Sequence, residues 1–163
     1  MKSLNTNNDI YLVPAFTGLG APYWNANARG VLSGITRDTS PKEIIRATIE
    51  AVAYQTFDLF EAMKHDGLRP KIVKVDGGMV MNNWFSQFLS DIVNVKVLRP
   101  KVQETTALGA AFMAGLQIGV YKSLKDISKK WHLDKKFSPK MKNQNRSFLI
   151  KGWEKAVERA LIN

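Results

Sequence analysis

The chain has 163 residues, of which 45% are hydrophobic, so it can bury the core of one domain of ordinary size. It contains no cysteine and only two widely separated histidines, His65 and His132, which excludes disulfides and thiolate sites and leaves no metal site built from side chains alone. The net charge is +10, no apolar run approaches the length of a membrane span, and the polar start lacks the core of a signal peptide, so we expect a soluble cytoplasmic protein without membrane contact.

Two strands are predicted near the N-terminus. Residues 10–16 read as a strand whose Pro14 indicates an edge or a strand end, and residues 30–35 read as a second strand. A turn-rich loop, 17–24, joins them. The aromatic residues Phe16, Tyr23 and Trp24 are predicted either to pack within the domain or to form an exposed patch that promotes self-association.

The clearest helix start follows the second strand. Ser40 suits the N-cap, Pro41 the first helical position, and Glu43 lies three residues after the cap. The helix is predicted to pack through apolar residues at helical spacing, and its charged residues fall largely on other faces. The apolar set is Ile45, Ile49, Val52, Leu59, Phe60 and Met63, and the charged set is Arg46, Glu50, Asp58 and Glu61.

Strands and helices then alternate. The predicted order is a strand at 71–75, a helix at about 82–93, a strand at 95–98 and a helix of small residues at 105–115. The helix at 82–93 presents its apolar residues at i, i+3, i+4 and i+7, which are Phe85, Phe88, Leu89 and Ile92. This alternation predicts an α/β fold with a mixed, partly parallel sheet and helices packed on it.

The tail carries most of the positive charge. Residues 121–163 hold twelve Lys or Arg against four Asp or Glu, a net charge of +8, and residues 1–120 hold the remaining +2. Lysine predominates and no aromatic residues interleave in a recognition pattern, which favours a solvated surface over a polyanion or nucleic-acid contact. We therefore predict a single domain over 1–163, with 1–9 linker-like or disordered, 10–120 as the core, and 121–163 as a basic tail ending in a helix at about 146–161.

The strand at 71–75 runs into Asp76-Gly77-Gly78, a short turn and a helix opening at Asn82. Glycines let a flat base or a ribose lie directly on the backbone, and both can take positive φ and expose their N–H groups. A helix N-terminus favours phosphate, and the Asn82 amide could read an adenine edge. An ordinary tight turn explains the same residues, with Asp76 capping the turn and Asn83 capping the helix.

Several segments together resemble the FGGY family of carbohydrate kinases. They are 14–24, 28–37, 43–50 with Arg46-Ala47, Val75-Asp76-Gly77-Gly78 with Asn82, Arg99-Pro100, and 105–111. Within that family they are similar to the members that phosphorylate glycerol. The resemblance implies a ribonuclease H-like second domain of the actin, Hsp70 and hexokinase type. Asn25 and Asp38 depart from the family pattern, where an acid and a glycine are usual, and Asp38 puts the backbone angle of its turn in doubt.

The resemblance implies roles for individual residues of this chain. Gly77, Gly78 and Asn82 match positions that touch the adenosine side of ATP or ADP in the family. The small-residue helix at 107–115 would pack closely behind the site. The catalytic base, the glycerol-binding residues and the first domain that helps hold Mg²⁺ lie earlier in family members and have no counterpart here, so no catalytic residue and no metal ligand is assigned.

The chain therefore looks truncated. The resemblance implies the adenosine-binding portion of an ATP:glycerol 3-phosphotransferase, inactive alone, whose partners are ATP or ADP, a missing N-terminal kinase domain and, in the complete enzyme, glycerol. The alternative is a non-catalytic interaction module that binds through its basic tail.

Overall fold

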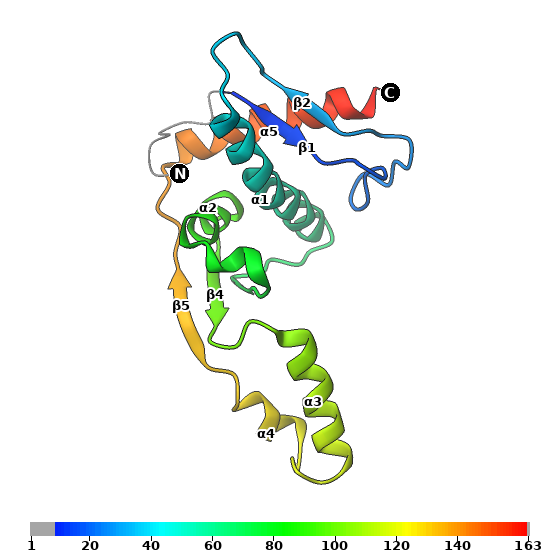
Figure 1. The fold of residues 1–163 in the computed structure, drawn as a ribbon, viewed down its shortest axis with the longest axis vertical. Coiled ribbons are helices and arrows are strands. Elements are labelled where there is room, and N and C mark those ends of the chain that lie inside the picture. The colour runs from blue at the N-terminus through cyan, green and yellow to red at the C-terminus, as the bar shows by residue number, and fades with distance from the viewer. Residues whose placement is uncertain (1–8, 163) are drawn as a thin grey trace.

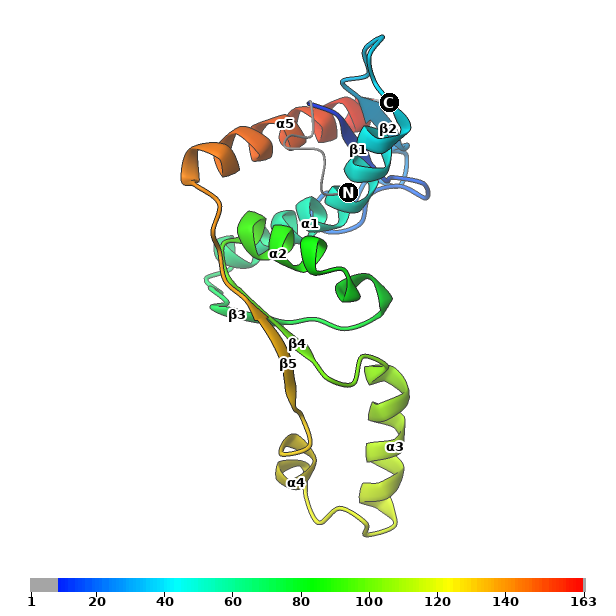
Figure 2. The same cartoon turned by 60° about the vertical axis from the view of Figure 1, so that its left-hand side comes forward.

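The computed structural model describes residues 9–162, so the predicted linker at 1–9 lies outside the described residues except for Asp9. These residues form a packed upper part and a lower arm that extends away from it (Figures 1 and 2). None of the helices within residues 9–162 is long and apolar enough to cross a membrane.

The N-terminal strands form a small antiparallel sheet between two helices. β1 (Tyr11–Val13) pairs with β2 (Val31–Ser33), and Val13 lies opposite Val31. α1 packs against β1, and α5 packs against both strands. Both strands were predicted, but each is shorter than its predicted range. The loop between them leaves Phe16 and Trp24 largely exposed, whereas Tyr23 packs against the core.

α1 (Pro41–His65) begins as predicted. The Ser40 side chain accepts a hydrogen bond from the Lys42 N–H, and the Ser40 N–H donates to the Glu43 carboxylate at 3.0 Å, which completes the capping box. Cap and proline together fix where the helix starts.

The predicted packing face of α1 is wrong in part: Phe60 is buried and Ile49 packs against the core, but the other four apolar residues do not. Ile45 is 54% exposed, and Val52, Leu59 and Met63 also remain at the surface. Small residues and a tyrosine face inward instead, because α1 lies close to both β1 and α2. The inward set is Ala47, Ala51, Ala53 and Tyr54, with Phe60.

Two of the acidic residues predicted to lie on other faces of α1, Glu50 and Asp58, are buried instead. Glu50 is fully buried, and its carboxylate accepts a hydrogen bond from Arg46 Nε at 2.6 Å. Asp58 is 7% exposed and accepts a hydrogen bond from Trp153 Nε1 at 2.9 Å. Each buried carboxylate thus has a donor, which is what burial of a charge requires.

A second sheet has the strand order β3-β4-β5. β3 (Ile72–Lys74) runs parallel to β4 (Lys96–Pro100), as predicted, and β4 is antiparallel to β5 (Leu133–Phe137). β5 was not predicted, because only its last residue, Phe137, is buried and its sequence is mostly polar. α2 (Asn83–Val93) buries the predicted apolar set, Phe85, Phe88, Leu89 and Ile92.

The arm comprises α3 (Thr105–Gln117) and α4 (Leu124–Ser128). In Figure 2 it extends below the sheet, away from α1, α2 and α5. Only Gly115 of α3 is buried, beneath the ring of Tyr121 in the same arm. The expectation that 107–115 packs behind the glycine turn is therefore wrong for the described residues, because no strand or helix covers this segment.

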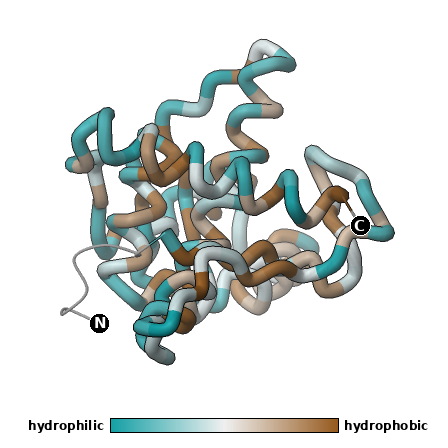
Figure 3. The backbone as a smooth tube through the Cα atoms, turned by 90° about the horizontal axis from the view of Figure 1, so that it is seen from above, coloured by the Kyte–Doolittle hydropathy of each residue, from teal (hydrophilic) through white to brown (hydrophobic). Residues whose placement is uncertain are grey.

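α5 (Asn143–Leu161) completes the core. Trp153 is fully buried and stacks on Tyr54 with ring centroids 5.3 Å apart. A Cβ on Gly152 would lie 2.2 Å from the Tyr11 hydroxyl, so glycine permits α5 to approach β1. The core thus draws on both sides of the boundary predicted at residue 120. In Figure 3, hydrophobic and hydrophilic stretches alternate along the helices, in keeping with helices that bury one face.

Candidate functional site

The glycine turn (residues 75–82) follows β3. Gly77 has φ 85° and ψ 174°, a backbone conformation that residues with a Cβ rarely adopt. Its N–H donates to the Gln103 carbonyl at 3.1 Å, so this N–H is engaged rather than exposed as predicted. The bond ties the turn to the segment that leads into α3.

Gly78 is exposed and begins the 3₁₀ helix η1 (Gly78–Met81). The φ of Gly78 is not positive, although a positive φ was predicted to be possible at both Gly77 and Gly78. A Cβ at Gly77 or Gly78 would meet no other atom within 4 Å, so the space in front of both residues is open.

Asn82 is the N-cap of α2. Its Oδ1 accepts hydrogen bonds from the N–H groups of Trp84 at 3.0 Å and Phe85 at 3.3 Å. The alternative in which Asn83 caps this helix is therefore wrong. Asn82 is exposed, and its amide NH₂ makes no hydrogen bond to any residue that the structure describes, so it remains a donor at the surface of the turn.

Arg99 of β4 supports the glycine turn through hydrogen bonds to its backbone. Its side chain is 7% exposed, and Nη1 donates to the carbonyl oxygens of Val80 at 2.7 Å and Met81 at 3.2 Å. Its Nε donates to Asp134 Oδ2 of β5 at 2.7 Å. This role of Arg99 was not predicted, because the predicted strand ended at residue 98, whereas β4 extends to Pro100 and includes Arg99.

The surface of the turn therefore offers a restricted chemistry. Backbone glycines, the Asn82 amide and the exposed side chains of Met79 and Met81 can contact a flat, polar ring from one side. No cluster of three or more metal-ligating side chains occurs in residues 9–162, so these residues contribute no multidentate metal site. With the exposed Asp76 carboxylate at its start, the turn suits binding of a polar ligand from one side.

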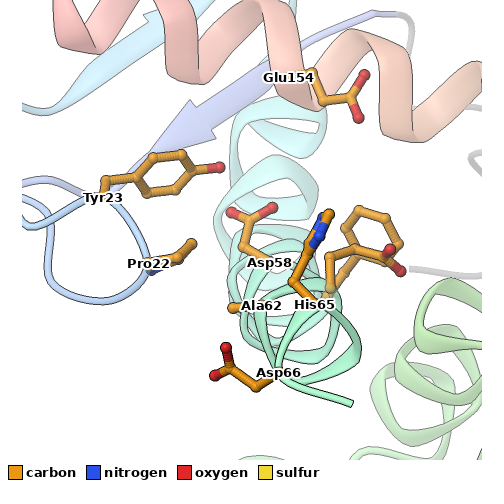
Figure 4. Close-up of a pocket in the computed structure, with 9 residues that line it drawn as sticks. Pro22, Tyr23, Asp58, Ala62, His65, Asp66 and Glu154 are labelled. Atoms are coloured by element: carbon orange, nitrogen blue, oxygen red, sulfur yellow. The ribbon is translucent and has the colours of Figure 1, made fainter. Parts of the chain in front are cut away.

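A cavity of about 450 Å³ lies elsewhere, between the loop after β1, α1 and α5 (Figure 4). Tyr23 and Asp58 both point into this cavity, and Glu154 of α5 lines it as well. The pKa of Asp58 is raised to about 6, mainly by burial. Hydrogen bonds from Trp153 and Tyr23 oppose this rise, and the negative charge of Glu154 adds to it. Burial, then the Asp58 charge, raises the pKa of Tyr23 as well. These groups link three segments, and sequence reasoning did not bring them together.

A second cavity, of about 400 Å³, lies beside α5. Three cations at spacing i, i+4 and i+8 line it, and Asp9 is the acidic residue at its rim. The cations are Lys151, Lys155 and Arg159. Neither cavity includes Gly77, Gly78 or Asn82.

Comparison with known proteins identifies the relatives of this chain. Residues 2–118 match the FGGY family of carbohydrate kinases, C-terminal domain. Glycerol kinase 1 of Pseudomonas aeruginosa is 56% identical over 153 residues, which cover 94% of this chain and 31% of that protein. Glycerol kinase of Thermoanaerobacter pseudethanolicus is 54% identical over 99% of this chain and 32% of its own length. The chain thus spans about a third of the length of these relatives.

Solved structures agree. Plasmodium falciparum glycerol kinase with ADP superposes with a TM-score of 0.85 at 37% identity, covering 99% of this chain and 33% of that one. Xylulose kinase from Rhodospirillum rubrum, at 19% identity and a TM-score of 0.75, shares the fold. These neighbours confirm the expected actin- and hexokinase-like ATPase fold.

Proposed function

This chain belongs to the FGGY family of carbohydrate kinases, and we propose that it supplies the adenosine-binding side of an ATP-dependent glycerol kinase. The observation that carries this proposal is the open space in front of Gly77 and Gly78. The buried side chain of Arg99 supports the backbone of the same turn through a hydrogen bond to Val80. A related solved structure contains ADP, which supports a nucleotide as the ligand.

Each residue then has a defined role. The bare backbone at Gly77 and Gly78 lets the adenosine approach without meeting a side chain. The Asn82 NH₂ donates to an acceptor on the base or the ribose, while its oxygen keeps α2 capped. Because α2 begins at this point, its N-terminus adds partial positive charge towards the phosphates.

Phosphoryl transfer needs groups beyond these residues. A positioned base for the glycerol hydroxyl and a surface that holds the Mg²⁺-bound triphosphate from the far side are both required. The described residues offer no such metal cluster, so we assign Mg²⁺ to the substrate, MgATP, and to the first domain. Accordingly, the 163 residues alone are expected to bind nucleotide weakly and to transfer no phosphoryl group.

Titration with ADP, followed by NMR of backbone amides, tests the site directly. We expect shifts concentrated at residues 77–82, with saturation only at high ADP concentration. A Gly78→Leu variant should abolish these shifts while the fold is retained, because its side chain projects into open space. Gly20→Leu is the matched control, since Gly20 is equally unobstructed and lies in a remote loop. Shifts centred elsewhere, or unchanged by Gly78→Leu, contradict the proposal.

A second candidate function rests on the cavity beside α5. Its three cations suit an anionic ligand, as expected for an interaction module that binds through a basic surface. Inorganic polyphosphate should then shift the amides of α5 rather than those of residues 77–82, and the effect should fall with added salt.

A further inference from the structure

The 3₁₀ helix η1 presents two methionine side chains at the surface of the glycine turn. Met79 is 44% exposed and Met81 is 55% exposed, whereas Val80 between them is buried. A 3₁₀ helix has three residues per turn, so successive side chains project about 120° apart. Because Val80 is directed inwards, the two thioethers are directed outwards on either side of it.

Buried donors fix the backbone of η1. The hydroxyl of Ser86, a fully buried residue, donates to the Val80 carbonyl at 2.9 Å, and Arg99 Nη1 donates to the same oxygen at 2.7 Å. Arg99 Nη1 also donates to the Met81 carbonyl at 3.2 Å. The outward positions of Met79 and Met81 are therefore set by the fold of the turn.

Met81 lies on the same face of η1 as Gly78. Side chains three residues apart eclipse one another in a 3₁₀ helix, and Met81 is three residues after Gly78. The space in front of Gly78 is open. A flat ligand that lies on the bare backbone at Gly78 is therefore next to the Met81 thioether, and thioethers make favourable contacts with aromatic rings.

Both exposed sulfurs are open to oxidation. The chain contains no cysteine, so none of its own thiols competes for a peroxide. The thioether sulfur attacks one oxygen of hydrogen peroxide, the O–O bond breaks, and the proton of the transferred oxygen passes to the departing hydroxide, which leaves as water. The sulfur is oxidised by two electrons to the sulfoxide and the peroxide is reduced. A polar, chiral group then replaces an apolar one.

We propose that Met79 and Met81 form a peroxide-sensitive modification site that sets the nucleotide affinity of the glycine turn. In the reduced state their thioethers contact the nucleobase. In the oxidised state the sulfoxide oxygens disrupt this apolar contact, and the affinity for ADP falls. Sulfoxide reductases reverse the modification. The inference rests on the proposed function, because it requires a nucleotide to bind at residues 77–82.

Treatment of the full 163-residue chain with hydrogen peroxide tests the proposal. Mass spectrometry of peptides locates the added oxygen atoms, and NMR of backbone amides follows titration with ADP before and after treatment. Oxidation at Met79 and Met81 should weaken ADP binding by about three- to tenfold, as expected for the loss of one or two thioether–ring contacts. Methionine sulfoxide reductases A and B, which together reduce both epimers, should restore the initial affinity.

Substitution by leucine identifies the sulfurs responsible. The Met79→Leu/Met81→Leu variant should have the same ADP affinity before and after peroxide, whatever its starting value, because leucine has no sulfur to oxidise. Met113→Leu is the matched control, since Met113 is 52% exposed but lies on α3, and this variant should lose affinity on oxidation as wild type does. Because the modified side chains are exposed, the oxidised chain should retain the circular dichroism spectrum of the reduced chain.

Several results would overturn this inference alone. They are an ADP affinity that is unchanged once both sulfurs are oxidised, an equal loss in the Met79→Leu/Met81→Leu variant, and protection by Met113→Leu. A loss that is accompanied by unfolding, or that the reductases do not reverse, overturns it as well. The untreated chain gives the separate test of the proposed function. If ADP causes no shifts at residues 77–82 of that chain, the proposed function is wrong and this inference is wrong with it.

Discussion

The two halves of this molecule differ in what they do with large apolar side chains: one half buries them and the other leaves them exposed. The closed half, formed by β1, β2, α1 and α5, buries Tyr54 and Trp153 completely and gives a donor to each buried carboxylate. The open half, formed by β3, the glycine turn and α3, leaves apolar residues and a strand edge at the surface. The first half thus buries its large side chains, whereas the second leaves apolar side chains and the glycine turn exposed.

Loss of a core side chain should give the largest difference between the halves. Trp153→Ala removes the stack on Tyr54 and the donor to Asp58, so it should lower the free energy of unfolding by about 3–5 kcal/mol. Met113→Ala, in the arm, should change it by less than about 0.5 kcal/mol. Urea denaturation measures both. Similar losses in the two variants would mean that the arm also belongs to the cooperative core.

The buried carboxylate of Asp58 should make the stability of the closed half depend on pH. Its folded pKa of about 6 is above the ordinary value of 3.8, so the folded state holds this proton more tightly than the unfolded state does. The stabilisation that comes from protonated Asp58 is fully present below the ordinary pKa of 3.8, and it is lost as the pH rises through the folded pKa of about 6. The unfolding free energy of wild type minus that of Asp58→Asn should therefore fall between about pH 4 and pH 7. A difference that rises or stays constant over this interval would contradict the assignment.

Arg99 is a buried residue that supports the exposed glycine turn of the open half. Arg99→Met leaves the carbonyl oxygen of Met81 and the carboxylate of Asp134 without this donor and should cost about 1–3 kcal/mol of stability. Amide shifts caused by ADP at residues 77–82 should weaken as well. Lys96→Met, an exposed position on the same strand, is the control and should change neither quantity.

Within the glycine turn, two adjacent residues should respond differently. Gly77→Ala places a Cβ at φ 85° and should cost about 1–2 kcal/mol, although nothing obstructs the side chain. Gly78→Ala should cost almost nothing, since neither φ nor space opposes it. Thermal melts of the two variants give this comparison, and equal losses would show that the turn is not held at the observed φ.

Local signals in the sequence predicted much of the fold. The capping residues at Ser40 and Glu43 and the apolar spacing of α2 are short-range features, so they were readable without tertiary context. The parallel pairing of β3 and β4 followed from the alternation of strands and helices. The sequence of β5 shows no such pattern, because this strand lies at the edge of its sheet and buries only Phe137, so most of its residues are polar.

Long-range contacts account for what was missed. The spacing of Ile45, Val52 and Leu59 places them on one side of α1, but it does not show which side the rest of the molecule covers. Asp58 and Arg99 are buried against partners on other elements, and Glu50 is buried against Arg46 of its own helix. A pattern based on hydrophobicity assigns such residues to the surface. At the candidate site, the sequence indicated the positions of Gly77, Gly78 and Asn82 but not the hydrogen bond from Gly77 to Gln103.

That hydrogen bond has a measurable consequence. One residue separates Gln103 from α3, so a displacement of α3 would move the acceptor of the Gly77 N–H. If ADP binding at residues 77–82 changes this peptide plane, the exchange rate of the Gly77 amide should report it.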